Sequence, residues 1–122
     1  MFSKESLLTN RLKSIKYAIK GALLLLKKEL SIKIQFCIAL LVIIAGFVFN
    51  ISTTEWIIQL LAIGIVMSIE GLNTAIEEIA NFIHPEYHNR IGYIKDIAAG
   101  AVFIAAAFAS VIGLIIYLPK IF

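Results

Sequence analysis

Residues 56–80 read "WIIQLLAIGIVMSIEGLNTAIEEIA", an apolar run that continues directly into a polar one. The apolar half extends to Met67 and is suited to the interior of a bilayer, where a transmembrane helix needs about 20 mostly apolar residues. The second half carries carboxylates and an amide, namely Glu70, Asn73, Glu77 and Glu78. The sequence therefore predicts a membrane helix with polar chemistry near one end.

The composition of the whole chain agrees with a membrane protein. Of its 122 residues, 61% are hydrophobic and 16% are charged, and the mean hydropathy is +0.95. A soluble domain of this size could not bury so much apolar surface. Cys37 is the single cysteine, which excludes an intramolecular disulfide and a metal site built from cysteines.

We predict an all-α integral membrane protein that forms a single membrane domain over residues 1–122. Its parts are an amphipathic surface helix at 1–30 and three transmembrane helices at 31–49, 56–83 and 96–118. The first helix repeats leucine and isoleucine at spacings of three and four residues, with lysine and arginine on its other side. The third span carries small residues every fourth position, a pattern that lets membrane helices approach closely: Ala101, Ala105, Ala109 and Gly113.

The distribution of basic residues predicts the orientation. Eight of the eleven Lys and Arg residues lie at or before Lys33, and the connector at 81–95 carries Arg90 and Lys95. The turn at 50–55 has none, so the N-terminus and the connector are expected on the cytoplasmic side of a multi-pass protein. Lys120, on the far side, disagrees with this pattern. Next to a membrane, the basic helix is expected to meet anionic headgroups and no nucleic acid.

The polar residues of the second span share one face of their helix. Relative to Glu70, Asn73 lies at roughly −60° and Glu77 at roughly −20°. Counting from Trp56, Glu70 is about 21 Å along the helix and Glu77 about 31 Å, against a hydrocarbon core of about 30 Å. A charge at the depth of Glu70 is costly unless it is paired, solvated or metal-bound.

Carboxylates gathered at a membrane surface suit Mg²⁺, which takes one or two of them together with phosphate oxygens. They could equally carry protons. Glu29 is a candidate partner because it ends the basic helix at the same cytoplasmic level. Glu77 and Asp96 also have plainer explanations, since Glu77 could be a solvated charge at a helix end and Asp96 a charge favoured by a helix N-terminus.

With these residues in place, the sequence resembles the small integral-membrane lipid kinases of bacteria, the diacylglycerol kinase and undecaprenol kinase family. The resemblance covers nearly the whole chain. It is carried by "EGLNTAIE" at 70–77, "PEYH" at 85–88 and "KDIAAGAV" at 95–102, with "YAIKG" at 17–21 and Glu29 in support. The chain departs from the family pattern at Asn10 and Tyr93, where the family often has arginine.

The resemblance implies ATP- and Mg²⁺-dependent phosphorylation of the primary hydroxyl of a lipid alcohol at the bacterial inner membrane. The acceptor would be undecaprenol as first choice and diacylglycerol as second. The enzyme would be a homotrimer with composite sites between subunits. Glu70 would be the general base and Asn73 would steady the base or the phosphoryl group, while Glu29 and Glu77 would hold Mg²⁺. The residues implied around ATP are Asn10, Tyr17, Glu29, Glu77, Glu86, Tyr87, His88, Lys95 and Asp96.

Two other classes of function remain at this point. A small cation- or proton-coupled transporter would use Glu70 to bind the coupling ion, but the first and third spans offer no charge for an outward path. A structural or regulatory membrane subunit would leave Glu70 and Asn73 unexplained.

Overall fold

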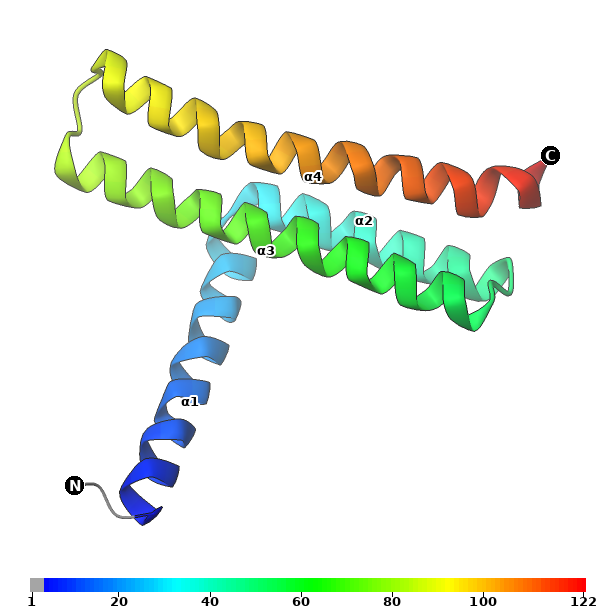
Figure 1. Ribbon diagram of the computed structural model, residues 1–122, viewed down its shortest axis with the longest axis horizontal. Coiled ribbons are helices and arrows are strands. Elements are labelled where there is room, and N and C mark those ends of the chain that lie inside the picture. Colours follow the sequence, from blue (N-terminus) through cyan, green and yellow to red (C-terminus); the bar gives the residue numbers. More distant parts are fainter. Residues whose placement is uncertain (1–3) are drawn as a thin grey trace.

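The structure, a computed structural model, describes residues 4–122, and four helices account for most of them (Figure 1). They are α1 (Lys4–Lys28), α2 (Leu30–Val48), α3 (Thr53–Ile83) and α4 (Asn89–Ile121). The prediction of an all-α chain is confirmed. Residues 1–3, which we assigned to the surface helix, lie outside the described part.

Three of the helices, α2, α3 and α4, are long and apolar enough to cross a membrane. They form a bundle in which α4 runs beside α3 and α2 lies behind α3 (Figure 1). With 31 residues, α3 is roughly 46 Å long, which exceeds the roughly 30 Å hydrocarbon core. One end of α3 therefore projects beyond the bilayer interior.

The fourth helix is longer than the predicted third span. It begins at Asn89, whereas the sequence placed residues 89–95 in a connector and began the span at residue 96. The ring of His88 explains the earlier start, because its Nδ1 accepts the backbone N–H of Arg90 at 3.0 Å and caps the helix. The helix also continues through Pro119 to Ile121, past the predicted end at 118. Proline has no backbone N–H to donate, but in the last turn of a helix this costs only one hydrogen bond and the helix ends soon afterwards.

A tight turn joins α2 to α3. Asn50 adopts a left-handed conformation with φ of 51°, which asparagine tolerates better than most residues. The hydroxyl of Ser52 accepts the N–H of Glu55 at 3.2 Å, and the Glu55 carboxylate accepts the N–H of Ser52 at 3.0 Å. This reciprocal cap fixes the start of α3. Close to the same turn, the ring of Trp56 packs against Gly46. Only glycine fits there, because a Cβ at this position would lie 2.7 Å from the ring.

The first helix leaves the bundle at a steep angle (Figure 1). The chain turns at Glu29, whose backbone is extended with ψ of 115°. One helical turn earlier, Leu25 lies against α3, where its Cδ1 would be 3.0 Å from a Cβ placed on Gly71. The base of α1 is therefore held close to the polar part of α3.

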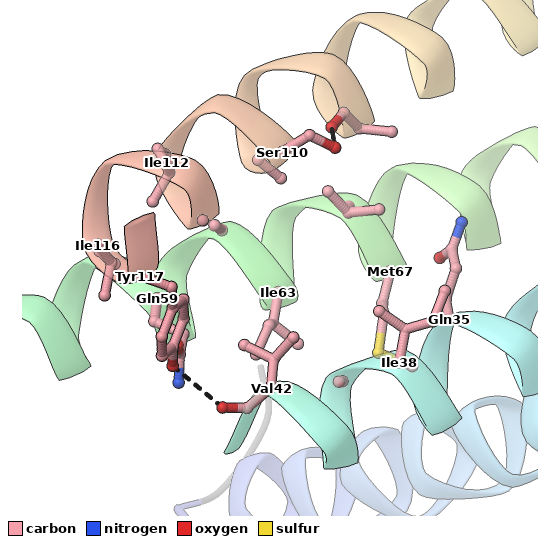
Figure 2. A pocket seen from close by; sticks show the side chains of 16 residues that line it. Gln35, Ile38, Val42, Gln59, Ile63, Met67, Ser110, Ile112, Ile116 and Tyr117 are labelled. Carbon is pink, nitrogen blue, oxygen red and sulfur yellow. Dashed lines mark hydrogen bonds between the residues drawn. The ribbon is translucent and has the colours of Figure 1, made fainter. Parts of the chain in front are cut away.

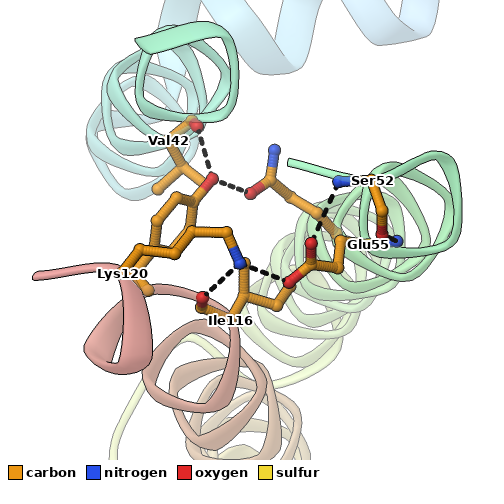
Figure 3. Close-up of polar contacts among 7 residues, drawn as sticks. Val42, Ser52, Glu55, Ile116 and Lys120 are labelled. Carbon is orange, nitrogen blue, oxygen red and sulfur yellow. Dashed lines mark hydrogen bonds and ion pairs between the residues drawn. The ribbon is translucent and has the colours of Figure 1, made fainter. Parts of the chain in front are cut away.

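A polar network ties the three long helices together near the α2–α3 turn (Figure 3). Lys120 donates to Glu55 Oε2 at 2.7 Å and to the carbonyl of Ile116 at 2.9 Å. The hydroxyl of Tyr117 contacts Gln59 Oε1 and the carbonyl oxygen of Val42, the latter at 3.1 Å. The ion pair neutralises Lys120, the basic residue that disagreed with the predicted orientation.

A single chain buries little of its apolar surface. Its buried apolar residues are few: Ile32, Ala39, Ile51, Ala80, Ala98 and Ile116. Most of the large apolar side chains on the helices are exposed. Exposed apolar surface on this scale needs lipid or other protein surfaces to cover it.

Candidate active site

The polar residues of α3 occupy one stripe that faces the inside of the bundle. Glu70 and Asn73 are each 8% exposed and are among the most buried polar side chains in the described part of the chain. Glu77 is half-buried, whereas Glu78, at the margin of the face, is exposed. Burial thus separates Glu70 and Asn73 from an ordinary solvated helix end.

Glu70 has a partner on the neighbouring helix. Gln35 of α2 donates from Nε2 to Glu70 Oε2 at 3.4 Å. The carboxylate is therefore held by a neutral amide, and not by a lysine or arginine. Within the described part of the chain, this is the hydrogen bond that the Glu70 side chain makes.

Asn73 is bonded to the second carboxylate of the stripe, Glu77. Its Nδ2 donates to Glu77 Oε1 at 3.4 Å. Its Oδ1 is buried and has no hydrogen-bond partner among residues 4–122. A buried amide oxygen without a partner is costly, so this atom points to a donor or a cation that the isolated chain does not supply.

Glu29 lies at the same level of the bundle as Glu77. It is half-buried, and its side chain makes no capping hydrogen bond to α2. It precedes Gln35 by six residues on α2, while Glu77 follows Glu70 by seven on the antiparallel α3. Both therefore lie about 9–10 Å from the Gln35–Glu70 contact, toward the same end of the bundle.

The beginning of α4 adds a cation at this end. Lys95 donates to Asn81 Oδ1 at 2.7 Å, and Asn81 falls at roughly +20° from Glu70, on the same face of α3. Asp96, which we expected at the start of a span, lies two turns inside α4. The attraction of a helix N-terminus for negative charge fades within the first turn, so it does not explain Asp96.

The connector between α3 and α4 is ordered by its own side chains. His84 and His88 stack edge to face with ring centroids 5.5 Å apart, and His84 Nδ1 lies 2.6 Å from the carbonyl oxygen of Glu86. The ring of Tyr87 lies over Gly92, where a Cβ would be 3.2 Å from Cε2. Glu86, Tyr87 and His88 are all exposed and can meet a ligand from water.

Asn10 and Tyr17 stand apart from the other candidates. Both are exposed on α1, which points away from the bundle (Figure 1). Along the helices, Glu29, Glu70, Asn73, Glu77 and Lys95 therefore lie toward one end of the bundle, whereas Asn10 and Tyr17 lie on the helix that leaves it.

Across residues 4–122, no group of three or more His, Cys, Asp or Glu side chains comes together to hold a metal ion unaided. The residues nonetheless fit Mg²⁺. Glu77 and Glu29 are at one level, and the unpartnered Asn73 Oδ1 offers a further hard oxygen. Mg²⁺ commonly takes only one or two carboxylates and completes its shell with phosphate oxygens and water.

Sequence reasoning missed Gln35 and Asn81. Each had a signal: Gln35 is a lone amide in the apolar run "IQFCIALLVII", and Asn81 continues the polar face of α3 by one more turn. It also missed the contacts among Gln59, Tyr117 and Val42, which join residues far apart in the sequence.

Comparison with known proteins shows the family of the chain. A family model described as prokaryotic diacylglycerol kinase matches residues 16–117. The undecaprenol kinase of Bacillus subtilis is 38% identical over 109 residues, which are 89% of this chain and 89% of the relative. The diacylglycerol kinase of Haemophilus influenzae is 29% identical over 105 residues, 86% of this chain and 89% of the relative. That of Synechocystis sp. is 30% identical over 113 residues, 92% of this chain and 65% of the relative.

The chain belongs to the prokaryotic diacylglycerol kinase family. It is thus a phosphotransferase of the lipid kinase type, as the resemblance implied. The relatives described above are kinases, which gives the transporter alternative no support.

Proposed function

We propose that the protein transfers the γ-phosphoryl group of ATP, with Mg²⁺, to the primary hydroxyl of a membrane lipid alcohol. The observation that carries this proposal is the buried carboxylate of Glu70, held by Gln35 inside a span and next to Asn73 and Glu77. Undecaprenol is the first choice of acceptor, supported by the 38% identity to an undecaprenol kinase, and diacylglycerol is the second.

In the proposed reaction, the oxygen of the lipid hydroxyl forms a bond to the γ-phosphorus of ATP as the bond to the β-phosphate oxygen breaks. Glu70 accepts the hydroxyl proton, and ADP is the leaving group. Gln35 holds Glu70 Oε2, so that Oε1 faces the hydroxyl. Because this type of transfer asks for positioning and charge stabilisation more than covalent chemistry, a carboxylate and an amide held in place are sufficient protein groups.

Glu29 and Glu77 are the proposed Mg²⁺ ligands, and Asn73 lies between Glu77 and the base. When bound, Mg²⁺ would neutralise charge on the phosphates of ATP. Asn73 Oδ1, which has no partner within the chain, would receive a hydrogen bond or contact the cation once the nucleotide is present. The depth difference between Glu70 and Glu77 would place the lipid hydroxyl below the headgroups, with the γ-phosphate reaching inward to it and the other phosphates of ATP nearer the water boundary.

The proposed nucleotide site uses the connector and the start of α4. Glu86, Tyr87, His88, Lys95 and Asp96 would surround ATP, with Asn10 and Tyr17 contributed by α1. Lys95 is the cation already placed over the polar face by its bond to Asn81. Arg90 supplies a guanidinium beside Tyr93, with Cζ 5.6 Å from the ring centroid. That is the position where the family often has arginine.

A homotrimer with composite sites would explain two features of the single chain. The exposed apolar faces of the bundle need covering surfaces, and Asn10 and Tyr17 lie on a helix directed away from their own bundle. We also propose that the N-terminus and the connector face the cytoplasm, where ATP is available. Lys120, the one basic residue that opposes this orientation, is paired with Glu55, and it is outnumbered by the basic residues of α1 and the connector.

The test is a kinase assay on the purified protein in detergent micelles. Labelled ATP, Mg²⁺ and either undecaprenol or diacylglycerol are supplied, and labelled phospholipid is measured. Glu70→Gln should lower kcat by about 100-fold or more, since general-base catalysis contributes about that much. Glu78→Gln is the matched control, because Glu78 lies on the same helix but is exposed.

Three results would each contradict part of the proposal. Equal product from the wild type and from Glu70→Gln would remove Glu70 as the base. If Glu78→Gln lowers kcat to the same extent, the effect of Glu70→Gln comes from the loss of a negative charge on α3 and not from the buried position of Glu70. A wild-type protein that phosphorylates neither alcohol would contradict the proposed activity itself.

A further inference from the structure

A cavity of about 470 Å³ lies among α2, α3 and α4 (Figure 2). Its walls are apolar along most of their length and include Ile38, Val42, Ile63, Met67 and Ile112. Its volume falls in the range of small-molecule sites in proteins, which are typically about 300–1,000 Å³. It is not part of the polar stripe described above.

Each end of the cavity carries an amide side chain, from half-buried Gln35 at one end and buried Gln59 at the other. Gln35, at one end, is the residue that donates to Glu70. Gln59, at the other, is 3% exposed and contacts the Tyr117 hydroxyl. Gln35 Oε1 and Gln59 Nε2 are both buried without a hydrogen-bond partner within the chain. The cavity therefore runs from Gln35, the residue bonded to the proposed catalytic base, to a polar end wall at Gln59 and Tyr117.

Small residues of α4 keep the cavity open. Ala109 and Gly113, from the small-residue pattern predicted to allow close helix packing, line it. No atom lies within 4 Å of a Cβ placed on Gly113. At this level of the bundle, the small residues thus create space between helices of the same chain instead of filling it.

We propose that this cavity binds one hydrocarbon chain of the lipid alcohol, with the hydroxyl at Glu70 and the chain running past Gln35 toward Gln59. The inference rests on the proposed function. Gln35 and Val42, which are seven residues apart on α2, set the enclosed length at roughly 10 Å. Beyond the polar wall of Gln59 and Tyr117, the rest of a long chain returns to the bilayer.

The apolar lining and the continuity with Glu70 decide the occupant. A substrate whose hydroxyl reaches Glu70 from within the membrane must place its chain on one side of that residue, and the cavity begins at the residue bonded to it. Since the chain leaves an equally apolar bilayer, binding depends on packing against the walls more than on transfer from water. The cavity therefore selects the chain by its fit.

The experiment compares Gly113→Leu with Ala107→Leu. Both introduce leucine on α4, but Gly113 lines the cavity, whereas Ala107 is exposed and outside its lining. The lipid KM is measured in micelles for a series of primary alcohols of increasing chain length. For the wild type, KM should fall with length until the chain reaches roughly 10 Å and then level off.

In Gly113→Leu, the KM for long-chain alcohols should rise about 10-fold or more, as expected when a side chain occupies part of an apolar pocket. The KM for the shortest alcohol and the KM for ATP should stay at wild-type values. Ala107→Leu should keep the wild-type length dependence. If Gly113→Leu also keeps it, the cavity does not bind the chain.

A binding measurement separates this inference from the proposed activity. A long-chain alcohol with a photoreactive group near the middle of its chain should crosslink to α4 around Ser110 and Gly113 in the wild type, and lose this crosslink in Gly113→Leu. Crosslinks confined to the outer face of the bundle would overturn the inference even if the kinase is active. Crosslinks in the cavity with no phospholipid product would contradict the proposed function and leave chain binding standing.

Discussion

Gln35 of α2 and Glu70 of α3 are joined by a hydrogen bond of 3.4 Å, although 35 residues separate them in the sequence. The bond gives a buried carboxylate a neutral partner. A lysine or arginine in the same place would hold the carboxylate as a permanent ion pair and weaken it as a base. The amide instead orients one oxygen of the carboxylate without adding a charge beside it.

Replacing Gln35 by methionine should therefore impair turnover while leaving nucleotide binding intact. Methionine is of similar size but cannot donate to Glu70 Oε2. A hydrogen bond to a charged group contributes about 1.5–3 kcal/mol, so kcat should fall roughly 10- to 100-fold. The KM for ATP should not change, and steady-state kinetics measures both quantities. Cys37→Ala, at an exposed position two residues further along α2, is the control. A Gln35→Met enzyme with wild-type kcat would mean that Glu70 needs no help from α2.

The Mg²⁺ requirement should depend on Glu29 and Glu77 together. Glu29→Gln and Glu77→Gln each remove a proposed ligand, so each should raise the Mg²⁺ concentration for half-maximal rate by at least about 10-fold. The double variant should show less than the sum of the two effects if they share one ion. Titration of activity with Mg²⁺ at fixed ATP gives these values. Wild-type Mg²⁺ dependence in both single variants would place the ion elsewhere, and Glu78→Gln should behave as the wild type.

The stability of the bundle should be sensitive to Gly46. A Cβ at this position would lie 2.7 Å from two ring atoms of Trp56, and such overpacking typically costs about 1–3 kcal/mol. Gly46→Ala should accordingly unfold at a lower temperature in detergent than the wild type. Gly64→Ala is the control, because nothing lies within 4 Å of a Cβ there. The rings of Phe47 and Trp56 pack with centroids 4.8 Å apart, which indicates a turn with little room to adjust. If the two variants unfold at the same temperature, the turn can shift to accept the added methyl group.

Much of this arrangement was predictable because bilayer length and helical periodicity both act locally. The apolar runs predict the three long helices, and the 100° step of a helix by itself places Glu70, Asn73 and Glu77 on one face of α3. The start of α4 was not predictable in the same way. It depends on the His88 ring accepting the Arg90 N–H, a local bond that hydropathy does not report.

Contacts between helices were the part that the sequence could not supply. Nothing in a single span shows that Gln35 meets Glu70 or that Tyr117 meets Gln59, because these pairs depend on how α2, α3 and α4 rotate against one another. The cavity has the same origin. Alanine and glycine at every fourth position of α4 predicted that another helix packs closely against this face. Whether a helix does so or a cavity remains depends on how the neighbouring helices are placed.

The cap at Ser52 and the Glu55–Lys120 ion pair anchor one end of α3, whereas Glu70 and Glu77 lie toward its other end. An unbroken helix connects the two ends. Insertion or deletion of one residue between Gln59 and Glu70 would therefore turn every downstream carboxylate by about 100° and shift it by about 1.5 Å. Side chains along this segment can be exchanged one by one, but a change in their number would turn Glu70 away from Gln35 of α2.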